Sequence, residues 1–294
     1  MDVKTAHWSP AVSTGTPVLP PLRLISGVVA WWHVQLGAVA LLNLVLWVLA
    51  AAAVASHPVA GRTATEFAWL QLALSGVYML GCAFRSVLPV YDIPRLVIVD
   101  CPLSSVMVGR SVATVAEVCF GLQWALLVHH MALSSHSALG YAASLAVMPL
   151  IAVAEVFSWH AVLTTRQRGH MVENSLWGVA AALVVASLLL IGPHRHAELY
   201  VPMMIWCVGG AACAAFIFLV DVPMYRSRWR ADCAAGRCYQ AIPEGIRDVC
   251  RRRDVSHRWQ DWKSEMLWMS LYFSLGVWSS ISLVYASLAL FTQL

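Results

Sequence analysis

Long uninterrupted runs of apolar residues constrain this sequence more than any other feature. Of 294 residues, 60% are apolar and only 12% are Asp, Glu, Lys or Arg, about half the charged fraction of a typical soluble domain. The apolar residues come in runs of roughly 18 or more, the length that a helix needs to cross a bilayer. The pattern predicts an all-α, polytopic transmembrane helix bundle, and therefore an integral, multi-pass membrane protein.

Seven segments meet the length rule for a membrane-spanning helix. They cover residues 31–54, 67–84, 106–128, 139–162, 175–191, 200–220 and 266–291. The polar residues 1–30 are predicted to form an N-terminal tail. Residues 31–294 are predicted to form one seven-helix domain, which includes a basic loop at 222–265.

Lys and Arg residues are distributed unevenly between the two faces that seven spans define. The face that carries the N-terminal tail has sixteen of them, whereas the opposite face has only Arg62 and Arg195. Cytoplasmic loops of membrane proteins carry the excess of positive charge. We therefore expect the N-terminus and the basic loop to be cytosolic, and the C-terminus to lie outside.

Charged and polar residues within the third and fourth spans are the main candidates for function. The third span contains Arg110, Glu117 and Gln123, and the fourth contains Glu155 and His160. Such groups cost several kcal/mol in hydrocarbon unless they are paired or hydrated. We therefore expect all five to face the interior of the bundle.

The depths of these residues predict which of them pair. With about 1.5 Å of rise per residue, Arg110 lies roughly 6 Å, Glu155 roughly 11 Å and Glu117 roughly 16 Å below the cytosolic surface. The two spans are joined by a short loop, so they should pack as an antiparallel hairpin. Arg110 is expected to pair with Glu155, which leaves Glu117 as the titrating acid.

The basic loop is the only predicted extramembrane segment large enough for structure of its own. A short helix is expected from Pro243 to Arg251, because Pro suits a first turn and Arg suits a last turn. Arg251, Arg252 and Arg253 at its end would lie on the anionic lipid headgroups of the cytosolic leaflet. We assign these three residues, together with Gln123, to substrate binding.

The sequence assigns no metal and no identified cofactor. His33 and His160 near the cytosolic ends of their spans would permit haem ligation, and the histidines of the outer loops offer metal ligands, but without the spacing of a known site. The only partner that the sequence indicates is the lipid bilayer with its anionic headgroups. It does not indicate nucleic acid as a partner, and it does not constrain the oligomeric state. Motifs for nucleotide hydrolysis, zinc proteolysis and elbow-type serine hydrolysis are missing from the sequence.

Three functions are consistent with these residues. The first is a membrane-embedded enzyme that acts on a lipid or amphipathic small molecule from the cytosolic leaflet, with Glu117 as acid or base. In this hypothesis Glu155 and Arg110 hold the polar cluster in place, and His160 shuttles protons. The second is a proton-coupled transporter or channel that uses the same acids as a relay. The third is a membrane scaffold or assembly factor, in which buried charges only fix the register of the helices.

Overall fold

Long helices make up nearly all of the structure, a computed structural model that describes residues 27–56, 61–192 and 199–291. The helices are α1 (Val28–Ser56), α2 (Arg62–Val87), α3 (Val106–Ser134), α4 (Ala138–Thr164), α5 (Gln167–Ile191), α6 (Tyr200–Phe216), α7 (Val222–Ala234), α8 (Ile242–Arg251), α9 (Trp259–Leu271) and α10 (Val277–Phe291). Two π-helical segments, η4 (Ile217–Asp221) and η5 (Tyr272–Gly276), join α6 to α7 and α9 to α10 as continuous helices. Within the described ranges, seven helices are long and apolar enough to cross a membrane.

Every predicted span lies within one of these seven helices, but several helices extend beyond the apolar run. Helix α5 begins at Gln167 rather than at residue 175, and the sixth helix continues through α7 to Ala234. The predicted loop at 222–265 is therefore helical at both ends, and only residues 235–258 connect α7 to α9. Apolar length identifies the part of a helix in hydrocarbon, not the polar turns that continue beyond it. Residues 1–26, His57, His194, Arg195 and His196 lie outside the described residues.

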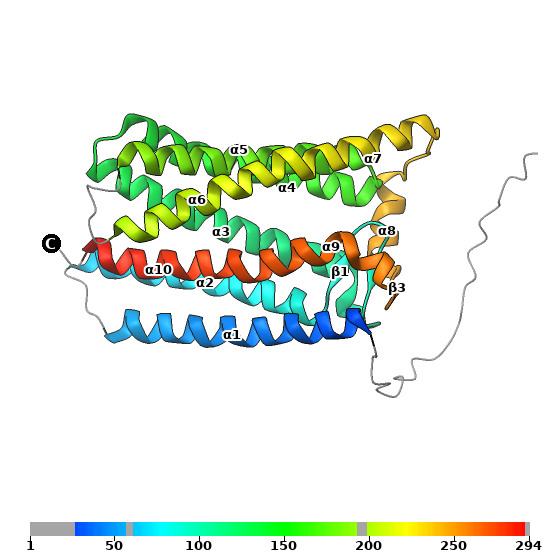
Figure 1. Ribbon diagram of the computed structural model, residues 1–294, viewed down its shortest axis with the longest axis horizontal. Helices are drawn as coiled ribbons and strands as arrows, with labels where there is room; N and C mark the ends of the chain where they lie inside the picture. Colours follow the sequence, from blue (N-terminus) through cyan, green and yellow to red (C-terminus); the bar gives the residue numbers. More distant parts are fainter. Residues whose placement is uncertain (1–26, 57–60, 193–198, 292–294) are drawn as a thin grey trace, which may run out of the picture.

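The helices lie side by side along the long axis of the molecule (Figure 1). Consecutive helices pack against each other from α1 to α6, and α10 returns beside α1 and α2. Short strands and α8 gather at one end, which we call the basic end. There β1 (Val90–Tyr91) pairs antiparallel with β2 (Leu96–Val97), which pairs in parallel with β3 (Asp254–Val255). The all-α prediction did not include this small sheet. The predicted short helix in the basic loop is confirmed as α8.

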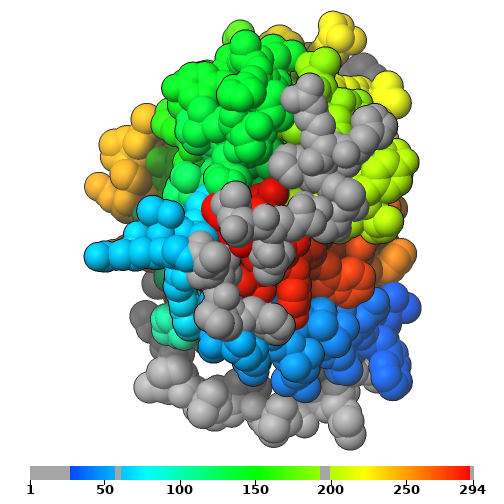
Figure 2. Space-filling model, turned by 90° about the vertical axis from the view of Figure 1, so that its left-hand side faces the viewer, coloured from blue at the N-terminus to red at the C-terminus, as the bar shows by residue number. Residues whose placement is uncertain are grey.

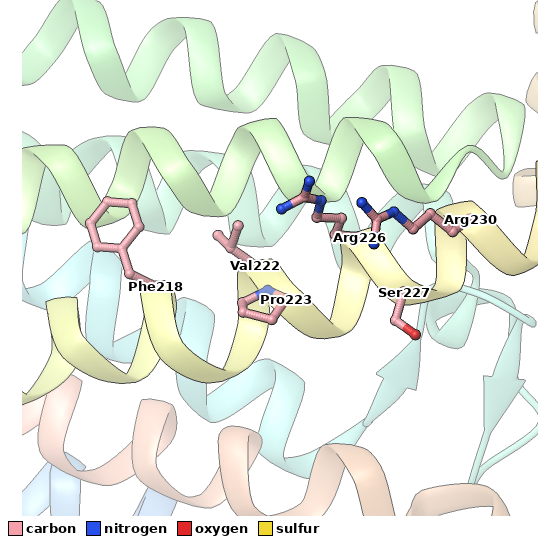
Figure 3. Close-up of a pocket in the computed structure, with 6 residues that line it drawn as sticks. All are labelled: Phe218, Val222, Pro223, Arg226, Ser227 and Arg230. Carbon is pink, nitrogen blue, oxygen red and sulfur yellow. The ribbon is translucent and has the colours of Figure 1, made fainter.

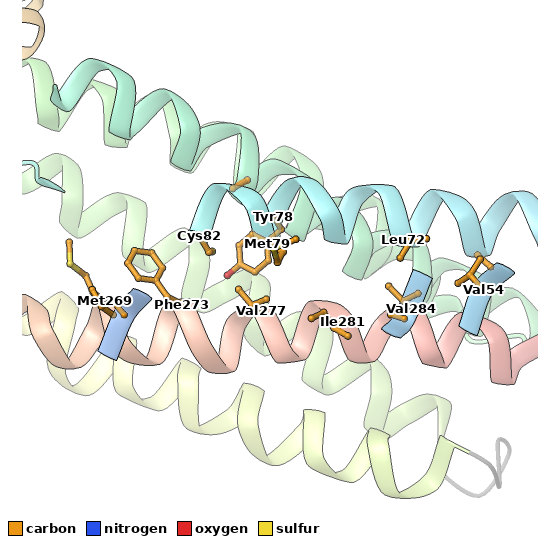
Figure 4. Packing of buried hydrophobic residues seen from close by; sticks show 14 of the residues in the cluster. Val54, Leu72, Tyr78, Met79, Cys82, Met269, Phe273, Val277, Ile281 and Val284 are labelled. Carbon is orange, nitrogen blue, oxygen red and sulfur yellow. The ribbon is translucent and has the colours of Figure 1, made fainter. Parts of the chain in front are cut away.

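The apolar core lies where α1, α2 and the α9–α10 helix meet. Figure 4 shows Tyr78, Met79 and Cys82 of α2 opposite Phe273 and Val277 of the last helix. Within its most apolar window, α2 has 56% of its residues buried, against 22% for α1 and for the α6–α7 helix. Helix α2 is therefore central, whereas α1 and α6 present most of their surface outward. Figure 2 views the molecule from the end opposite the basic end. There α10, in red, has α1 and α2 on one side and the green helices on the other.

Candidate functional site

One arginine on α3 binds carboxylates from three helices. The Nη2 atom of Arg110 lies 3.0 Å from Glu117 on α3, 2.8 Å from Glu155 on α4 and 3.3 Å from Glu173 on α5. All four residues are buried, with less than a tenth of each exposed. We call these four residues the carboxylate–arginine cluster.

Two hydroxyl groups donate hydrogen bonds to carboxylates of the cluster. Thr114 donates its hydroxyl to Glu155 Oε2 at 2.6 Å, and the indole of Trp159 donates to the Thr114 hydroxyl at 3.0 Å. Tyr272, the first residue of η5, donates its hydroxyl to Glu117 Oε1 at 3.1 Å. A π-helical turn inside an α-helix frequently marks a functional position, and here it carries a direct partner of the cluster.

A histidine connects the cluster with α7. His170 Nδ1 lies 2.8 Å from Glu173 Oε2, and the His170 ring packs against Tyr225 of α7 with centroids 5.3 Å apart. The His170 side chain is 12% exposed. His170 therefore links Glu173 to α7 and is itself mostly buried.

The charges of the cluster do not balance if every acid is ionised. Three carboxylates against one guanidinium leave two net negative charges, and a protonated His170 would reduce this to one. Uncompensated charge is costly away from water. One bound proton would lower this excess of negative charge.

Several polar atoms around the cluster have no partner among the described residues. They are Arg110 Nε, Glu155 Oε1 and the hydroxyl oxygen of Ser158, which are all shielded from solvent. Buried polar atoms are nearly always hydrogen-bonded, so each one needs an explanation. A donor, an acceptor and a hydroxyl in one buried region provide the partners that a bound water or a polar ligand group requires.

Glycines allow the helices to approach closely enough to form the cluster. At Gly169 in the first turn of α5, a Cβ atom would lie only 2.6 Å from Ala161 Cβ and 2.8 Å from the carbonyl oxygen of Phe157, both on α4. Glu173 follows Gly169 by one helical turn on the same face. The close α4–α5 contact therefore brings Glu173 to Arg110.

The structure brings some of the predicted site residues together and leaves one apart. The predicted pair of Arg110 and Glu155 is present. The depths had predicted that Glu117 would be separate from Arg110, and this prediction was wrong, because the two side chains form an ion pair. Residues seven apart share one face of a helix, so the long Arg110 side chain reaches Glu117 along α3. His160 points about 140° away from Glu155 around α4. In the described part of the chain, His160 has no hydrogen bond or ion pair with the cluster.

Besides the partners Thr114, Trp159 and Tyr272, two charged or titratable residues of the site were not among the predicted ones, Glu173 and His170. Glu173 and His170 lie in the polar first two turns of α5, before residue 175, where the predicted span began. Their spacing of three residues puts them on one helix face. That pattern was the signal in the sequence, but it is short and also common in surface helices.

Gln123 lies deeper in the bundle and takes part in a separate network. Its side-chain amide nitrogen donates to the backbone carbonyl of Gln71 at 3.0 Å. The side-chain amide nitrogen of Gln71 in turn donates to the backbone carbonyl of Gln123 at 3.1 Å. Ser280 donates its hydroxyl to Gln123 Oε1 at 2.5 Å. These bonds join α2, α3 and α10, so in this structure Gln123 connects helices.

The three predicted headgroup-binding arginines lie at the basic end in different environments. Arg252 pairs with Asp254 at 2.5 Å and Arg253 pairs with Asp100 at 2.9 Å, whereas Arg251 is exposed. The hydrogen bond to Asp254 raises the pKa of Arg252. Nearby, Arg95 is buried and binds Asp248 of α8 at 2.9 Å and the Val162 carbonyl of α4 at 2.7 Å. Arg95 therefore fastens α8 to the bundle.

A second polar group lies between α7, α9 and β1. Arg228 donates to the Tyr91 hydroxyl at 3.4 Å. Burial raises the pKa of Tyr91, the carboxylate of Glu265 raises it further, and Arg228 opposes both effects. In the described part of the chain, no group of three or more His, Cys, Asp or Glu is arranged to hold a metal ion.

The fold and the cluster together define the class of this protein: a helical protein suited to a membrane, with a buried Arg/Glu cluster. Comparisons with models of known families, with curated proteins and with solved structures found no match. The functional argument therefore depends on the chemistry of the site.

Proposed function

We propose that this protein is a proton-coupled membrane transporter or channel in which the carboxylate–arginine cluster takes up and releases a proton. The observation that carries the proposal is the sharing of one Arg110 nitrogen by three buried carboxylates. Such a group has an excess of negative charge that a proton relieves. Its charge, and with it the packing of the helices that it joins, therefore depends on proton binding.

The enclosure of the cluster favours proton handling over substrate conversion. Less than a tenth of each cluster residue is exposed, and no cluster residue lines the pocket along α7 or the pocket at the basic end beside Arg95. An enzyme has to admit its substrate to the acid or base, whereas a proton reaches a buried acid through a chain of hydrogen-bonding groups. His170, Glu173, Glu117 and Tyr272 form contacts of this kind around Arg110.

Each residue has a distinct role in the proposed mechanism. His170 exchanges protons between the basic end and Glu173. Glu117 and Glu155 hold the bound proton between them, and Arg110 keeps the remaining carboxylates ionised by compensating their charge. We also propose that the basic end faces the cytosol, because positive charge is concentrated there. In this role His170 replaces His160 of the original hypothesis.

Proton movement through reconstituted protein tests the proposal. Liposomes that contain the purified chain and a trapped pH-sensitive dye are given a potassium diffusion potential, inside negative. We expect the interior to acidify faster than in protein-free liposomes. In Glu117→Gln the rate of acidification should fall to that of protein-free liposomes. The control is Glu66→Gln, because Glu66 is exposed and pairs with Arg62, one helical turn away on α2. A wild-type rate equal to that of empty liposomes, or an unchanged rate in Glu117→Gln, would overturn the proposal.

The enzyme hypothesis is the second candidate, and the unpartnered polar atoms at Arg110, Glu155 and Ser158 favour it. These atoms offer hydrogen bonds to the polar group of a lipid or other amphipathic molecule. Conversion of such a molecule by detergent-solubilised protein, lost in Glu117→Gln, would support the enzyme, because detergent provides no two-sided membrane. Under the scaffold hypothesis, Glu117→Gln changes neither measurement and only affects assembly.

A further inference from the structure

A groove follows one face of the helix that η4 and α7 form. Its volume is about 370 Å³, and Phe218, Val222, Arg226 and Arg230 line it at successive intervals of four residues. Residues four apart lie above one another on a helix. Figure 3 shows the two guanidinium groups next to each other, with Phe218 farther along the same helix. The groove is therefore apolar at one end and basic at the other.

The length of this helix indicates where the groove lies in a bilayer. The boundary between its apolar half and its basic half falls near the edge of the hydrocarbon core. Tyr200–Ala234 contains 35 residues, whereas about 20 residues suffice to cross the hydrocarbon core. A helix that enters the hydrocarbon near Tyr200 leaves it near Val222. Arg226 then lies about 6 Å farther out and Arg230 one more turn beyond, at the level of lipid phosphates.

No described residue neutralises the positive charges in the groove. In the described part of the structure, neither Arg226 nor Arg230 has an ion pair or hydrogen bond, in contrast to Arg252 and Arg253. Phe218, which lines the groove, is 40% exposed. The groove thus combines unpaired cations with an open apolar surface.

We propose that this groove binds one anionic phospholipid, independently of the proposed proton transport. The lipid phosphate lies between Arg226 and Arg230, as guanidinium groups bind phosphate oxygens in pairs. One acyl chain lies along Phe218 and Val222. A free phosphate would use only the basic half, and a zwitterionic lipid would leave the positive charge uncompensated.

Native mass spectrometry of the purified chain in detergent with equal amounts of phosphatidylglycerol and phosphatidylcholine tests this proposal. Each arginine near the bilayer surface contributes about 1 kcal/mol, so with two arginines we expect the wild type to retain phosphatidylglycerol in preference by about thirtyfold. In Arg226→Gln/Arg230→Gln the ratio should fall to about two or less. Arg226→Lys/Arg230→Lys should keep most of the preference, because the charge remains.

The control is Arg247→Gln/Arg258→Gln. These two arginines are also exposed, but they do not line the groove. The control should keep the wild-type ratio. An unchanged ratio in Arg226→Gln/Arg230→Gln, or an equal loss in the control, would overturn the proposal. Displacement of phosphatidylglycerol by equimolar inorganic phosphate would overturn it too, because the site would then bind a free anion. If the double variant does not fold, the single variants Arg226→Gln and Arg230→Gln must each reduce the ratio.

Discussion

Among single residues, Arg110 determines the state of the whole cluster. Its Nη2 atom faces three carboxylates, but a terminal guanidinium nitrogen carries only two hydrogens. The contact with Glu173, at 3.3 Å, is the longest of the three, so Glu173 is the carboxylate that Arg110 binds least tightly. His170 binds this same carboxylate. The carboxylate with the longest arginine contact thus has His170 as a second partner.

Replacement of Arg110 by Met should destabilise the protein strongly. Removal of one partner from a buried ion pair typically costs about 3–5 kcal/mol, because the remaining charge is left uncompensated. We expect a large fall in the thermal midpoint in detergent, partly restored by adding Glu155→Gln. Arg62→Gln, at a 91% exposed side chain, should leave the midpoint unchanged. Wild-type stability of Arg110→Met would show that the carboxylates do not depend on Arg110.

Part of the site was predictable from sequence at this scale, and part was not. Arg110, Glu117 and Glu155 are recognisable because a charge inside an apolar run is rare. Glu173 lies among polar residues at the start of α5, so nothing in the local sequence marks it as buried. It becomes buried only through the contact that Gly169 makes with α4. His160 was assigned because it is a polar group within the fourth span, although the helical period directs it away from Glu155.

At the scale of helices, the α4–α5 hairpin carries the site. Helices α4 and α5 make the most extensive contact between any two elements in the described chain. Their connection is a single short turn, in which Thr165 adopts a left-handed conformation with φ of 59°. The first turn of α5 is therefore held against the last turns of α4, where backbone atoms meet.

Gly169→Val should disrupt this hairpin. The added Cβ would lie 2.8 Å from a backbone oxygen of α4, which cannot move aside as a flexible side chain does. We expect a loss of about 1–3 kcal/mol of stability, as for other overpacked positions, together with loss of proton uptake. The matched control is Gly209→Ala in α6, whose Cβ would meet nothing within 4 Å. It should be neutral or stabilising by up to about 1 kcal/mol. Equal effects of the two substitutions would contradict the assigned role of the close contact.

The apolar pattern predicted the seven long helices but not their ends or interruptions. Hydrophobic length reports the stretch in hydrocarbon, so α5 and α7 extend into polar sequence. The π-helical segments η4 and η5 have no composition that separates them from the flanking helices. The β2–β3 pairing joins segments more than 150 residues apart, Leu96 with Asp254. Only the assembled helices bring these strands together.

For the molecule as a whole, positive charge and small extramembrane elements gather at one end. The exposed cysteines Cys233, Cys238 and Cys250 lie in the same part of the chain. The loop between α3 and α4, which begins after Ser134, lies at the other end. The charge difference predicts that these two ends face opposite sides of the membrane, with the basic end in the cytosol.

Cysteine labelling tests this orientation. A membrane-impermeant maleimide should label Cys233, Cys238 and Cys250 only after cells are permeabilised. A Ser134→Cys variant, exposed at the opposite end, should be labelled in intact cells. Labelling of the native cysteines in intact cells would reverse the orientation, and the proposed route of protons through His170 would then begin outside the cytosol.

The central claim is that the cluster holds a proton within the membrane, and infrared spectroscopy measures this most directly. Wild-type protein at neutral pH should show the carbonyl stretch of a protonated carboxyl group. That band should be lost or strongly reduced in Glu117→Gln and Glu155→Gln, and retained in Glu66→Gln. A spectrum without that band, or a band that both cluster variants leave unchanged, would contradict the account.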